Sequence, residues 1–543
     1  MARRSLKYNA AILTATGFVV KILGFFYRIF IANRIGAEGL GLYQLMTPIY
    51  SLLVLVLSAG VSTAVSRFVA EESSKSTNRT AFKIASVAAG LVLGAGIIIC
   101  GILLLNLDTL VFITTNDART KDSLFWILIL VPPIAAVSAY KGYFYGKQEM
   151  IPNSIAQIIE QMTKLVFIIL MYDLFKGKGA DKMCLLAVIA LLIGECANIL
   201  TVYIAFEIKK RRSKPLYNAD EKTKGKNVSR AGNIIRQRSM GRFDKESNTK
   251  DEKKRLIKQI GKVALPLSVN RLLLSTLGTI ENLIIPKRLV LHGLSPQQSL
   301  EEFGRLTGMA SPLVFFPSML PMALATALVP AIASAIACRK FNVANRQISQ
   351  SIRLTLIMGL IFTAFFTSCA HELAELVYPG KNVGAILRLY SITGVFIYLQ
   401  QTMLGILNGL SKERAMLTNT LAGSLVRLLG VWLMIPVLGV NAYVYAVIAG
   451  SGVTIVLNFI TITKLTGISI DIGSWVVRPL SAALIGIAIS LLLKPLMVFT
   501  GVDIRISYLM VVAMSIVTIV AIYLIMGIIK REDIERWFLR RGK

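Results

Sequence analysis

Residues 84–106 read IASVAAGLVLGAGIIICGILLLN, an apolar run that contains no charged side chain. An α-helix needs about 20 such residues to cross a hydrocarbon core roughly 30 Å thick. Similar runs recur along the whole chain of 543 residues, of which 55% are hydrophobic and 16% are charged. The sequence therefore predicts an all-α integral membrane protein and leaves little length for a water-soluble domain.

Apolar runs bounded by charged or turn residues predict fourteen transmembrane helices. They lie near residues 10–32, 42–66, 84–106, 123–145, 153–172, 183–206, 260–285, 309–337, 354–370, 384–410, 415–438, 442–463, 475–498 and 507–529. An even number of spans places both termini on one side of the membrane. Most of the 60 Lys and Arg residues fall on that side, with or without the long central loop. The positive-inside rule therefore predicts cytoplasmic termini in a multi-pass protein of the cytoplasmic membrane.

The spans and the polar segments between them predict four parts of the chain. These are an N-lobe of helices 1–6 (1–206), a basic cytoplasmic linker (207–258), a C-lobe of helices 7–12 (259–470), and helices 13–14 with a basic cytoplasmic tail (471–543). The net charge of +31 would suggest a nucleic-acid partner in a soluble protein. Here the linker and the orientation rule explain the excess, so we expect no nucleic acid. The linker is either a flexible connection or a surface for anionic membrane lipids or acidic partners.

Two predicted cytoplasmic hairpins resemble each other. The fourth-to-fifth hairpin contains Tyr145-Gly146-Lys147 and then MIPNS at 150–154, whereas the tenth-to-eleventh contains Asn408-Gly409, Lys412 and then MLTNT at 416–420. Each hairpin has the same place in a block of six helices. This pattern predicts two parallel repeats related by an axis along the membrane normal, with a substrate site at their interface. Helices 13 and 14 stand outside the repeat.

The first predicted helix carries two cations in its apolar run. Lys21 and Arg28 are seven residues apart and share a face with Gly17 and Gly24. A charge at the bilayer centre costs about 2.5–3.5 kcal/mol, so each cation needs a partner or a polar cavity. No acidic residue lies within this span. The cations are therefore predicted to line a cavity, and the alternative is that their side chains snorkel to the membrane interfaces.

The seventh predicted helix has a comparable stripe. Arg271, Ser275, Gly278 and Asn282 follow one another at the same helical spacing. Two such faces, one in each lobe, would enclose a water-filled, positively charged cavity. We therefore predict that Arg271 and Asn282 join the two cations of the first helix in binding an anion, although Arg271 is equally well placed to snorkel.

Other charges within the spans favour structural pairing. Glu160 and Lys164 are four residues apart, which predicts an ion pair on one helix face. Glu281 is placed to pair with the arginine of its own helix or to face another helix. Glu195 and Arg427 are candidates for a pair between two helices.

Residues for bond chemistry are scarce in the sequence. The only two histidines, His292 and His371, fall in predicted external loops, and the five cysteines lack the spacing of a zinc site. The sequence His371-Glu372, followed by Glu375, is typical of a solvated helix end. No glycine loop with Lys-Ser or Lys-Thr that could hold a nucleotide is present. We therefore expect no catalytic residue, no metal site and no cofactor, and a protein that moves a molecule rather than an enzyme.

Three segments resemble a known family: KILGFFYRI at 21–29, IGAEGLGLY at 35–43 and AVSRFVAE at 64–71. They are similar to the polysaccharide-exporter branch of the multidrug/oligosaccharidyl-lipid/polysaccharide exporters, and most similar to its sporulation and lipid II flippase members. The resemblance implies two six-helix lobes in a V shape and alternating access. The implied cargo is a lipid-linked anionic saccharide, carried on undecaprenyl pyrophosphate, for peptidoglycan or a related envelope polymer of a bacterium.

The resemblance also implies roles for individual residues. Lys21 and Arg28 match the basic motif of the first helix that lines the cavity of lipid II flippases. Helices 13 and 14 would form a groove for the polyprenyl tail, and cell-wall synthesis proteins are possible partners. Those flippases also carry arginines in helices 2 and 8, whereas Leu52–Leu57 and Pro312–Pro317 are apolar here. This departure leaves open which lipid-linked saccharide is moved.

Three other functions compete with a flippase. A cation-coupled multidrug exporter of the same superfamily would typically use an acidic residue in the amino lobe, and the first helix has the opposite charge. A membrane glycosyltransferase or ligase would need an acidic or histidine cluster in a large external loop. The longest predicted external loop, Pro286–Gly308, offers only Glu301, Glu302 and one histidine. A non-transporting scaffold for envelope synthesis is the third.

Overall fold

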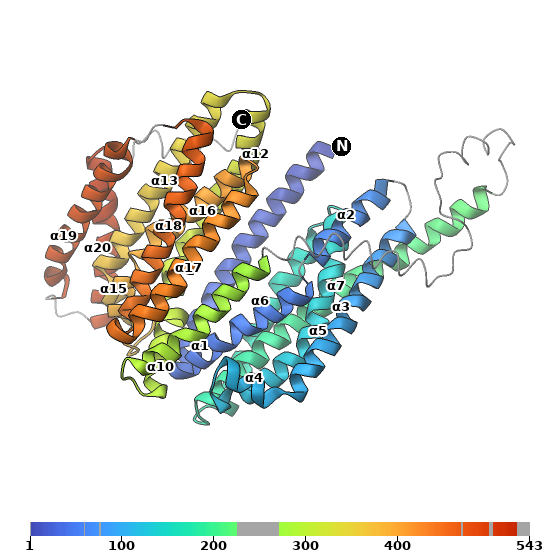
Figure 1. Cartoon of the computed structure of the whole chain (residues 1–543), viewed down its shortest axis with the longest axis horizontal. Helices are drawn as coiled ribbons and strands as arrows, with labels where there is room; N and C mark the ends of the chain where they lie inside the picture. The colour runs from blue at the N-terminus through green and yellow to red at the C-terminus, as the bar shows by residue number, and fades with distance from the viewer. Residues whose placement is uncertain are drawn as a thin grey trace. The chain divides into compact units, whose positions relative to one another are not determined.

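The structure is a computed structural model that describes residues 2–58, 60–74, 78–224, 271–468, 471–498 and 503–528. Every regular element in these ranges is a helix (Figure 1). Eleven helices of the described chain are long and apolar enough to cross a membrane. The protein is therefore an all-α, multi-pass membrane protein, as predicted. The count of fourteen spans stays a prediction, because the first two spans are continuous and the seventh begins outside the described ranges.

Contacts divide the chain into two compact units. Unit 1 contains Met1–Gly24, Met46–Gly177 and Leu185–Thr276, and unit 2 contains Phe25–Leu45, Lys178–Cys184 and Leu277–Lys543. The helices before the long loop are α1 (Ala2–Ser58), α2 (Val61–Ser74), α3 (Asn78–Leu105), α4 (Leu107–Thr114), η1 (Ala118–Thr120), α5 (Lys121–Gly146), α6 (Ile151–Phe175) and α7 (Ala180–Lys224).

The second part of the chain is equally helical. It contains a helix over 271–291, then α10 (Pro296–Phe303), η2 (Gly304–Ala310), α11 (Ser311–Phe315), η3 (Phe316–Ser318), α12 (Met319–Ala337), α13 (Phe341–Ser368), α14 (Ala370–Val377), α15 (Gly384–Tyr390), α16 (Thr393–Gly409), α17 (Glu413–Leu438), α18 (Asn441–Thr466), η4 (Gly473–Val477), α19 (Arg478–Val498) and α20 (Ile504–Ile525). Because α13, α19 and α20 pack together around buried Ala482, Ile519 and Tyr523, the last two helices belong to the core of unit 2.

Glycines decide where the first helices bend. Helix α1 continues through both predicted spans and kinks at Gly36, whose φ of 82° lies in the region that glycine adopts without strain. A second break comes at Gly60, with φ 73°, directly before α2. The predicted second span, 42–66, is therefore divided between α1 and α2.

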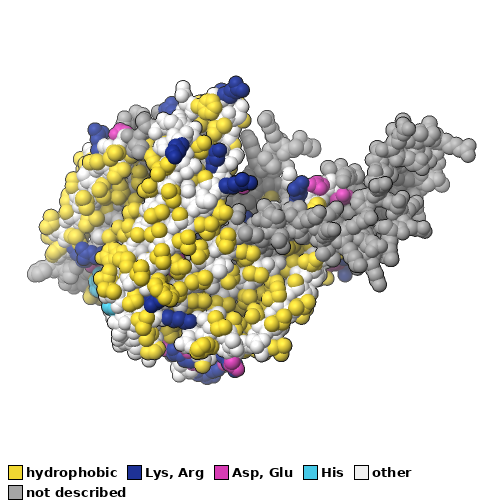
Figure 2. Space-filling view, in the orientation of Figure 1, with side chains coloured by type: hydrophobic (Ala, Val, Ile, Leu, Met, Phe, Trp, Pro, Cys, Tyr) yellow, Lys and Arg dark blue, Asp and Glu magenta, His cyan; other side chains and the backbone are white. Residues whose placement is uncertain are grey.

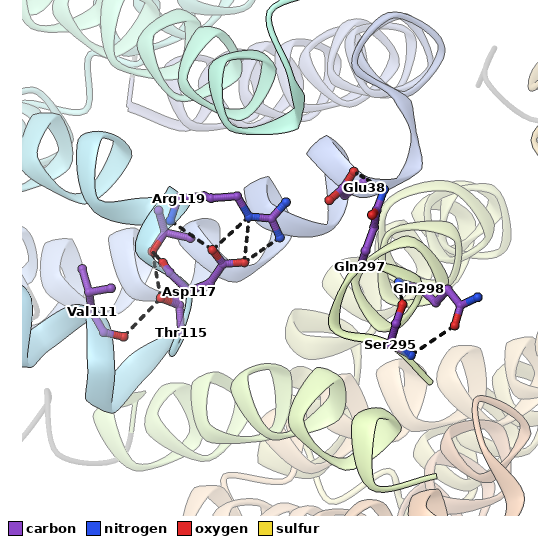
Figure 3. A network of polar contacts seen from close by, with 9 residues as sticks. Glu38, Val111, Thr115, Asp117, Arg119, Ser295, Gln297 and Gln298 are labelled. Carbon is purple, nitrogen blue, oxygen red and sulfur yellow. Dashed lines mark hydrogen bonds and ion pairs between the residues drawn. The ribbon is translucent and has the colours of Figure 1, made fainter. Parts of the chain in front are cut away.

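Two predicted connections are helical instead of irregular. Helix α7 extends through Lys224, so the first part of the predicted linker 207–258 is helix, and the rest of that linker lies outside the described residues. Lys, Arg and Glu are good helix formers, which explains the extension. The predicted external loop Pro286–Gly308 holds the end of the 271–291 helix, α10 and part of η2. Ser295 begins α10 with a capping box: its hydroxyl accepts a hydrogen bond from Gln298 N, and its own backbone N donates to Gln298 Oε1 (Figure 3).

Part of α1 packs against this same region inside unit 2. A Cβ on Gly41 would collide with the carbonyl oxygen of Leu300, and a Cβ on Gly304 would collide with the carbonyl oxygen of Ala37. Gln297 Nε2 donates to Glu38 Oε2 at 3.1 Å beside this crossing (Figure 3). Close backbone approach at paired small residues is a common way for helices to associate in membranes.

Unit 1 is organised around α5, on which α2 and α3 pack. A Cβ added to Gly142 of α5 would lie 2.6 Å from the carbonyl oxygen of Ser62, and one added to Gly146 would lie 2.5 Å from that of Ser66. Both partners belong to α2. The two glycines, four residues apart, therefore let the backbones of α5 and α2 touch.

Unit 2 repeats this contact between α16 and α12. A Cβ on Gly405 would lie 2.8 Å from the carbonyl oxygen of Ala325, and one on Gly409 would lie 3.2 Å from that of Val329. Residues 405, 409, 325 and 329 follow 142, 146, 62 and 66 by a constant 263 positions. The same helix crossing thus occurs in both units with one register.

A third contact follows the same shift. Gly96 of α3 lies against Pro132 of α5, and Gly359 of α13 lies against Val395 of α16, with 3.0 Å between each added Cβ and the partner Cα. The predicted repeat is supported, but one part of the hairpin match is not. Asn153 and Asn419 are 266 positions apart, three more than the shift of the repeat. Their hydrogen bonds differ as well, because Asn153 donates to Lys141 O and Asn419 donates to Asn458 Oδ1.

Apolar side chains cover much of the helical surface drawn in Figure 2, with Lys and Arg scattered among them and along the edges. Many are highly exposed, including Ile98 at 65%, Leu433 at 66% and Leu492 at 74%. Exposed apolar residues of this number and size would be unfavourable in water. They are suited to contact with lipid chains instead.

Candidate substrate-binding site

Both cations predicted in the first span lie in α1 before its kink. Lys21 and Arg28 are exposed. The boundary between the units falls between them, since Lys21 belongs to unit 1 and Arg28 to unit 2. Of the carboxylates in the described chain, none forms an ion pair with Arg28. Arg28 is thus a cation in a membrane-spanning helix that no carboxylate among the described residues neutralises.

Two tyrosines interact with Arg28 within unit 2. Its charge acts on buried Tyr27 and Tyr378. Tyr378 lies outside the spans, between α14 and α15, and Asn33 Nδ2 holds this segment by donating to Val377 O at 2.8 Å. Burial raises the pKa of Tyr378, and the positive charge of Arg28 opposes that rise. Arg28 therefore lies near two tyrosine hydroxyls, and no carboxylate of the described residues forms an ion pair with it.

The two predicted residues of the seventh span are also divided between the units. Arg271 is exposed and lies in unit 1, whereas Asn282 lies in unit 2. Asn282 Nδ2 donates to Gly278 O of its own helix at 2.8 Å, so one donor of the amide is already occupied. The convergence of Lys21, Arg28, Arg271 and Asn282 into one site stays a prediction.

The predicted pair on α6 is confirmed. Lys164 is buried, and its Nζ contacts Glu160 Oε1. Asn198 of α7 donates to the other carboxylate oxygen at 2.6 Å. Both carboxylate oxygens of Glu160 are therefore engaged by donors, one from its own helix and one from α7.

The predicted pairing of Arg427 with Glu195 is wrong. Arg427 of α17 binds Glu281 of the 271–291 helix instead: Nη2 lies 2.7 Å and Nε 2.8 Å from Glu281 Oε2. The side chain of Glu281 is 5% exposed. Because Glu281 takes this partner, it is not free to neutralise Arg271.

The shift of 263 residues relates the ion pair of Lys164 with Glu160 to that of Arg427 with Glu281. Lys164 of α6 and Arg427 of α17 are 263 positions apart. Each repeat therefore has a cation at the same position of its fifth predicted span. The acids differ, since Glu160 precedes Lys164 on its own helix and Glu281 comes from another. Sequence inspection missed this equivalence because the hairpin match suggested a different register.

A third ion pair corrects the prediction for His371-Glu372. Glu372 of α14 is 2% exposed, and its Oε1 lies 2.5 Å from Lys494 Nζ of α19. It is therefore not a solvated helix end. The ring of His371 lies 6.1 Å from that of Tyr508 in α20. Together these contacts attach α14 to the last two helices, and no group of three or more potential metal ligands occurs in the described ranges.

Comparisons with known proteins agree with this architecture. In Bacillus subtilis (strain 168), "Stage V sporulation protein B" is 26% identical over 540 residues, covering 99% of this chain and 98% of that protein. "Lipid II flippase MurJ" of the same organism is 24% identical over 509 residues, covering 88% and 87%.

Solved structures show the same fold. A lipid II flippase MurJ in an inward closed conformation has a TM-score of 0.65 at 13% identity, covering 97% of this chain and 100% of that one. An inward-facing multidrug resistance MATE family transporter of the MOP superfamily has a TM-score of 0.62 at 15% identity, covering 83% and 94%. The MatE family matches residues 307–433, and the polysaccharide biosynthesis protein family matches residues 6–336. The chain therefore belongs to the polysaccharide biosynthesis protein family and has the fold of the MOP-superfamily transporters.

Proposed function

We propose that this protein is an alternating-access flippase that moves an undecaprenyl-pyrophosphate-linked saccharide across a bacterial cytoplasmic membrane. The cargo would be a peptidoglycan precursor or a related envelope or spore-cortex unit. The family and the flippase relatives support the class of cargo. No bond is made or broken in such a step, so the protein would not be an enzyme.

The observation that carries the proposal is Arg28, an exposed cation in a membrane-spanning helix without a carboxylate partner among the described residues. Leaving a charge in this position costs about 2.5–3.5 kcal/mol unless something compensates it. A pyrophosphate offers that compensation through charge-assisted hydrogen bonds. With Lys21, and with Arg271 and Asn282 of the proposed C-lobe, Arg28 would bind the anionic head of the cargo.

The proposed architecture has fourteen spans in two parallel six-helix repeats, N-lobe 1–206 and C-lobe 259–470, followed by helices 13 and 14. The helix crossings repeated at a constant shift support it. The basic linker 207–258 and both termini would be cytoplasmic, where anionic lipids and cell-wall synthesis proteins are available as partners.

An accessibility assay tests the proposal. In spheroplasts or proteoliposomes, the double variant Lys21→Ala/Arg28→Ala should lower the exposure of lipid-linked precursor on the outer leaflet at least about tenfold, because each hydrogen bond to a charged group contributes about 1.5–3 kcal/mol. Arg28→Lys keeps the charge and should retain more activity. Arg67→Ala, which removes an exposed cation paired with Glu71 at 3.0 Å on α2, is the control and should act like wild type. Unchanged flipping by the double variant at normal protein levels would refute the cavity.

A cation-coupled multidrug exporter is the second candidate. The MatE match over residues 307–433 and the likeness to MATE structures favour it. It predicts that purified protein carries no polyprenyl lipid and that organic cations, rather than lipid-linked anions, are transported. Mass spectrometry of lipids extracted from the purified protein separates the two candidates.

A further inference from the structure

Tyr378 is a buried tyrosine of unit 2 whose hydroxyl group is unpaired. The residue is 0% exposed, and its hydroxyl oxygen has no hydrogen-bond partner among the described residues. Two other buried tyrosines of the same unit are paired: the hydroxyl of Tyr398 donates to Val314 O, and that of Tyr523 donates to Pro479 O at 2.7 Å. Burying an unpaired hydroxyl costs free energy, because the group loses its bonds to water and gains none in return. The hydroxyl of Tyr378 therefore requires an explanation.

The backbone around Tyr378 is fixed by hydrogen bonds on both sides. Its N–H donates to Ala374 O at 2.7 Å, and its carbonyl oxygen accepts from Lys381 N at 3.2 Å. Asn33 attaches the preceding residue to α1, because its Nδ2 donates to Val377 O at 2.8 Å. The unpaired hydroxyl thus belongs to a segment that is bonded to its own neighbours and to α1.

The charge that acts on this hydroxyl is positive. Arg28 lies five residues before Asn33 on α1 and acts electrostatically on Tyr378, and no carboxylate of the described chain forms an ion pair with Arg28. Tyr27, the other tyrosine on which Arg28 acts, has the hydroxyl of Tyr43 beside it. A tyrosine O–H can donate to an anion that a guanidinium also binds, and such charge-assisted hydrogen bonds are strong. Arg28 would repel a cation, so this pair of donors fits an anionic oxygen.

We propose that the Tyr378 hydroxyl donates a hydrogen bond to a phosphate oxygen of the cargo while Arg28 binds the same phosphate group. This contact rests on the proposed function, which supplies the pyrophosphate. With cytoplasmic termini, the 378–383 connection lies on the external side, so Tyr378 would bind the head of the cargo late in export. The hydroxyl is closed off in this structure, and the contact forms when the packing of this connection against α1 opens during transport. The phosphate then supplies the hydrogen bond that the closed arrangement lacks, and so favours the open one.

Two variants that each remove one hydroxyl test the proposal on the detergent-purified full-length protein. Tyr378→Phe removes a hydroxyl without a partner, so its Tm in the absence of ligand should equal or exceed that of wild type. Tyr398→Phe is the matched control, because Tyr398 is 1% exposed and its hydroxyl is bonded to Val314 O. Its Tm should fall below that of wild type. A Tm of Tyr378→Phe as low as that of Tyr398→Phe would show a structural role for the hydroxyl and overturn the proposal.

The second measurement is the Kd of a fluorescent undecaprenyl pyrophosphate in detergent micelles. Tyr378→Phe should raise this Kd at least about tenfold, because a hydrogen bond to a charged group is lost. Tyr398→Phe should leave it unchanged. Unlabelled inorganic pyrophosphate and undecaprenol, added as competitors, separate the head of the lipid from its tail. Competition by inorganic pyrophosphate that weakens in Tyr378→Phe supports a contact to phosphate from either source, and a loss confined to the lipid supports the lipid headgroup. Weaker competition by undecaprenol in Tyr378→Phe would place Tyr378 at the tail and overturn the proposal.

The double variant Lys21→Ala/Arg28→Ala separates this contact from the proposed function. If it binds the fluorescent lipid more weakly while Tyr378→Phe binds it like wild type, the contact is refuted and the flippase function stands. If wild type binds the lipid no better than undecaprenol, the proposed function fails and the contact fails with it.

Discussion

The crossing of α16 and α12 offers a sharp test of the packing, because it contains a glycine that cannot accept even one methyl group. The Cβ of a Gly405→Ala variant would lie 2.6 Å from the Cβ, 2.7 Å from the Cα and 2.8 Å from the carbonyl oxygen of Ala325. Carbon atoms in contact prefer about 3.5–4.0 Å, so the helices must separate by roughly 1 Å. Overpacking of this kind destabilises by about 1–3 kcal/mol.

The higher helix propensity of alanine partly offsets the destabilisation by overpacking. Alanine is better than glycine in a helix interior by about 1 kcal/mol. Gly94 of α3 has no neighbour within 4 Å of an added Cβ, so Gly94→Ala isolates this gain and is the matched control. The two variants are therefore expected to differ by about 1–3 kcal/mol, with Gly94→Ala the more stable. Gly142→Ala, the counterpart of Gly405→Ala in the other repeat, should behave like Gly405→Ala.

The assay is thermal unfolding of the detergent-purified protein, followed as the fraction that stays monodisperse in size-exclusion chromatography. Gly405→Ala and Gly142→Ala should have a lower Tm than wild type, and Gly94→Ala an equal or higher one. If Gly405→Ala were as stable as Gly94→Ala, the close approach of α16 to α12 would be refuted. If only one of Gly405→Ala and Gly142→Ala were less stable than Gly94→Ala, the equivalence of the two crossings would be refuted.

Two ion pairs provide further predictions. Glu281→Gln leaves the guanidinium of Arg427 without its anion; breaking a fully buried pair costs about 3–5 kcal/mol, and the partial exposure of Arg427 reduces this value. The double variant Glu281→Gln/Arg427→Gln should have a higher Tm than the single variant, and an equal or lower one would contradict the pairing. Lys494→Met leaves the Glu372 carboxylate buried and unpaired, so its Tm should fall below that of Lys494→Arg. Equal Tm values for these two variants would mean that the charge of Lys494 has no role in attaching α14 to α19.

Local patterns were read correctly from the sequence. The run at 84–106 predicts a span, and α3 covers nearly all of it. The spacing of Glu160 and Lys164 predicts their ion pair, because residues four apart on a helix meet wherever that helix lies. The position of Arg28 in an apolar helix follows in the same way. These features depend only on neighbouring residues and on the period of the helix.

Contacts between helices that lie far apart in the sequence could not be predicted from such local patterns. Glu281 and Arg427 are 146 residues apart, and only the packing of their helices decides that they meet while Glu195 takes other neighbours. Glu372 has the sequence context of a solvated helix end, yet α19 brings a lysine to it and buries it.

By itself, then, the sequence determined that this chain spans a membrane, where its main apolar helices lie and that its first helix carries cations, since each follows from composition and helical spacing. The tertiary structure alone decided the partner of each buried charge and the register of the repeat. The glycine crossings become visible only when helices from separate parts of the chain are placed side by side.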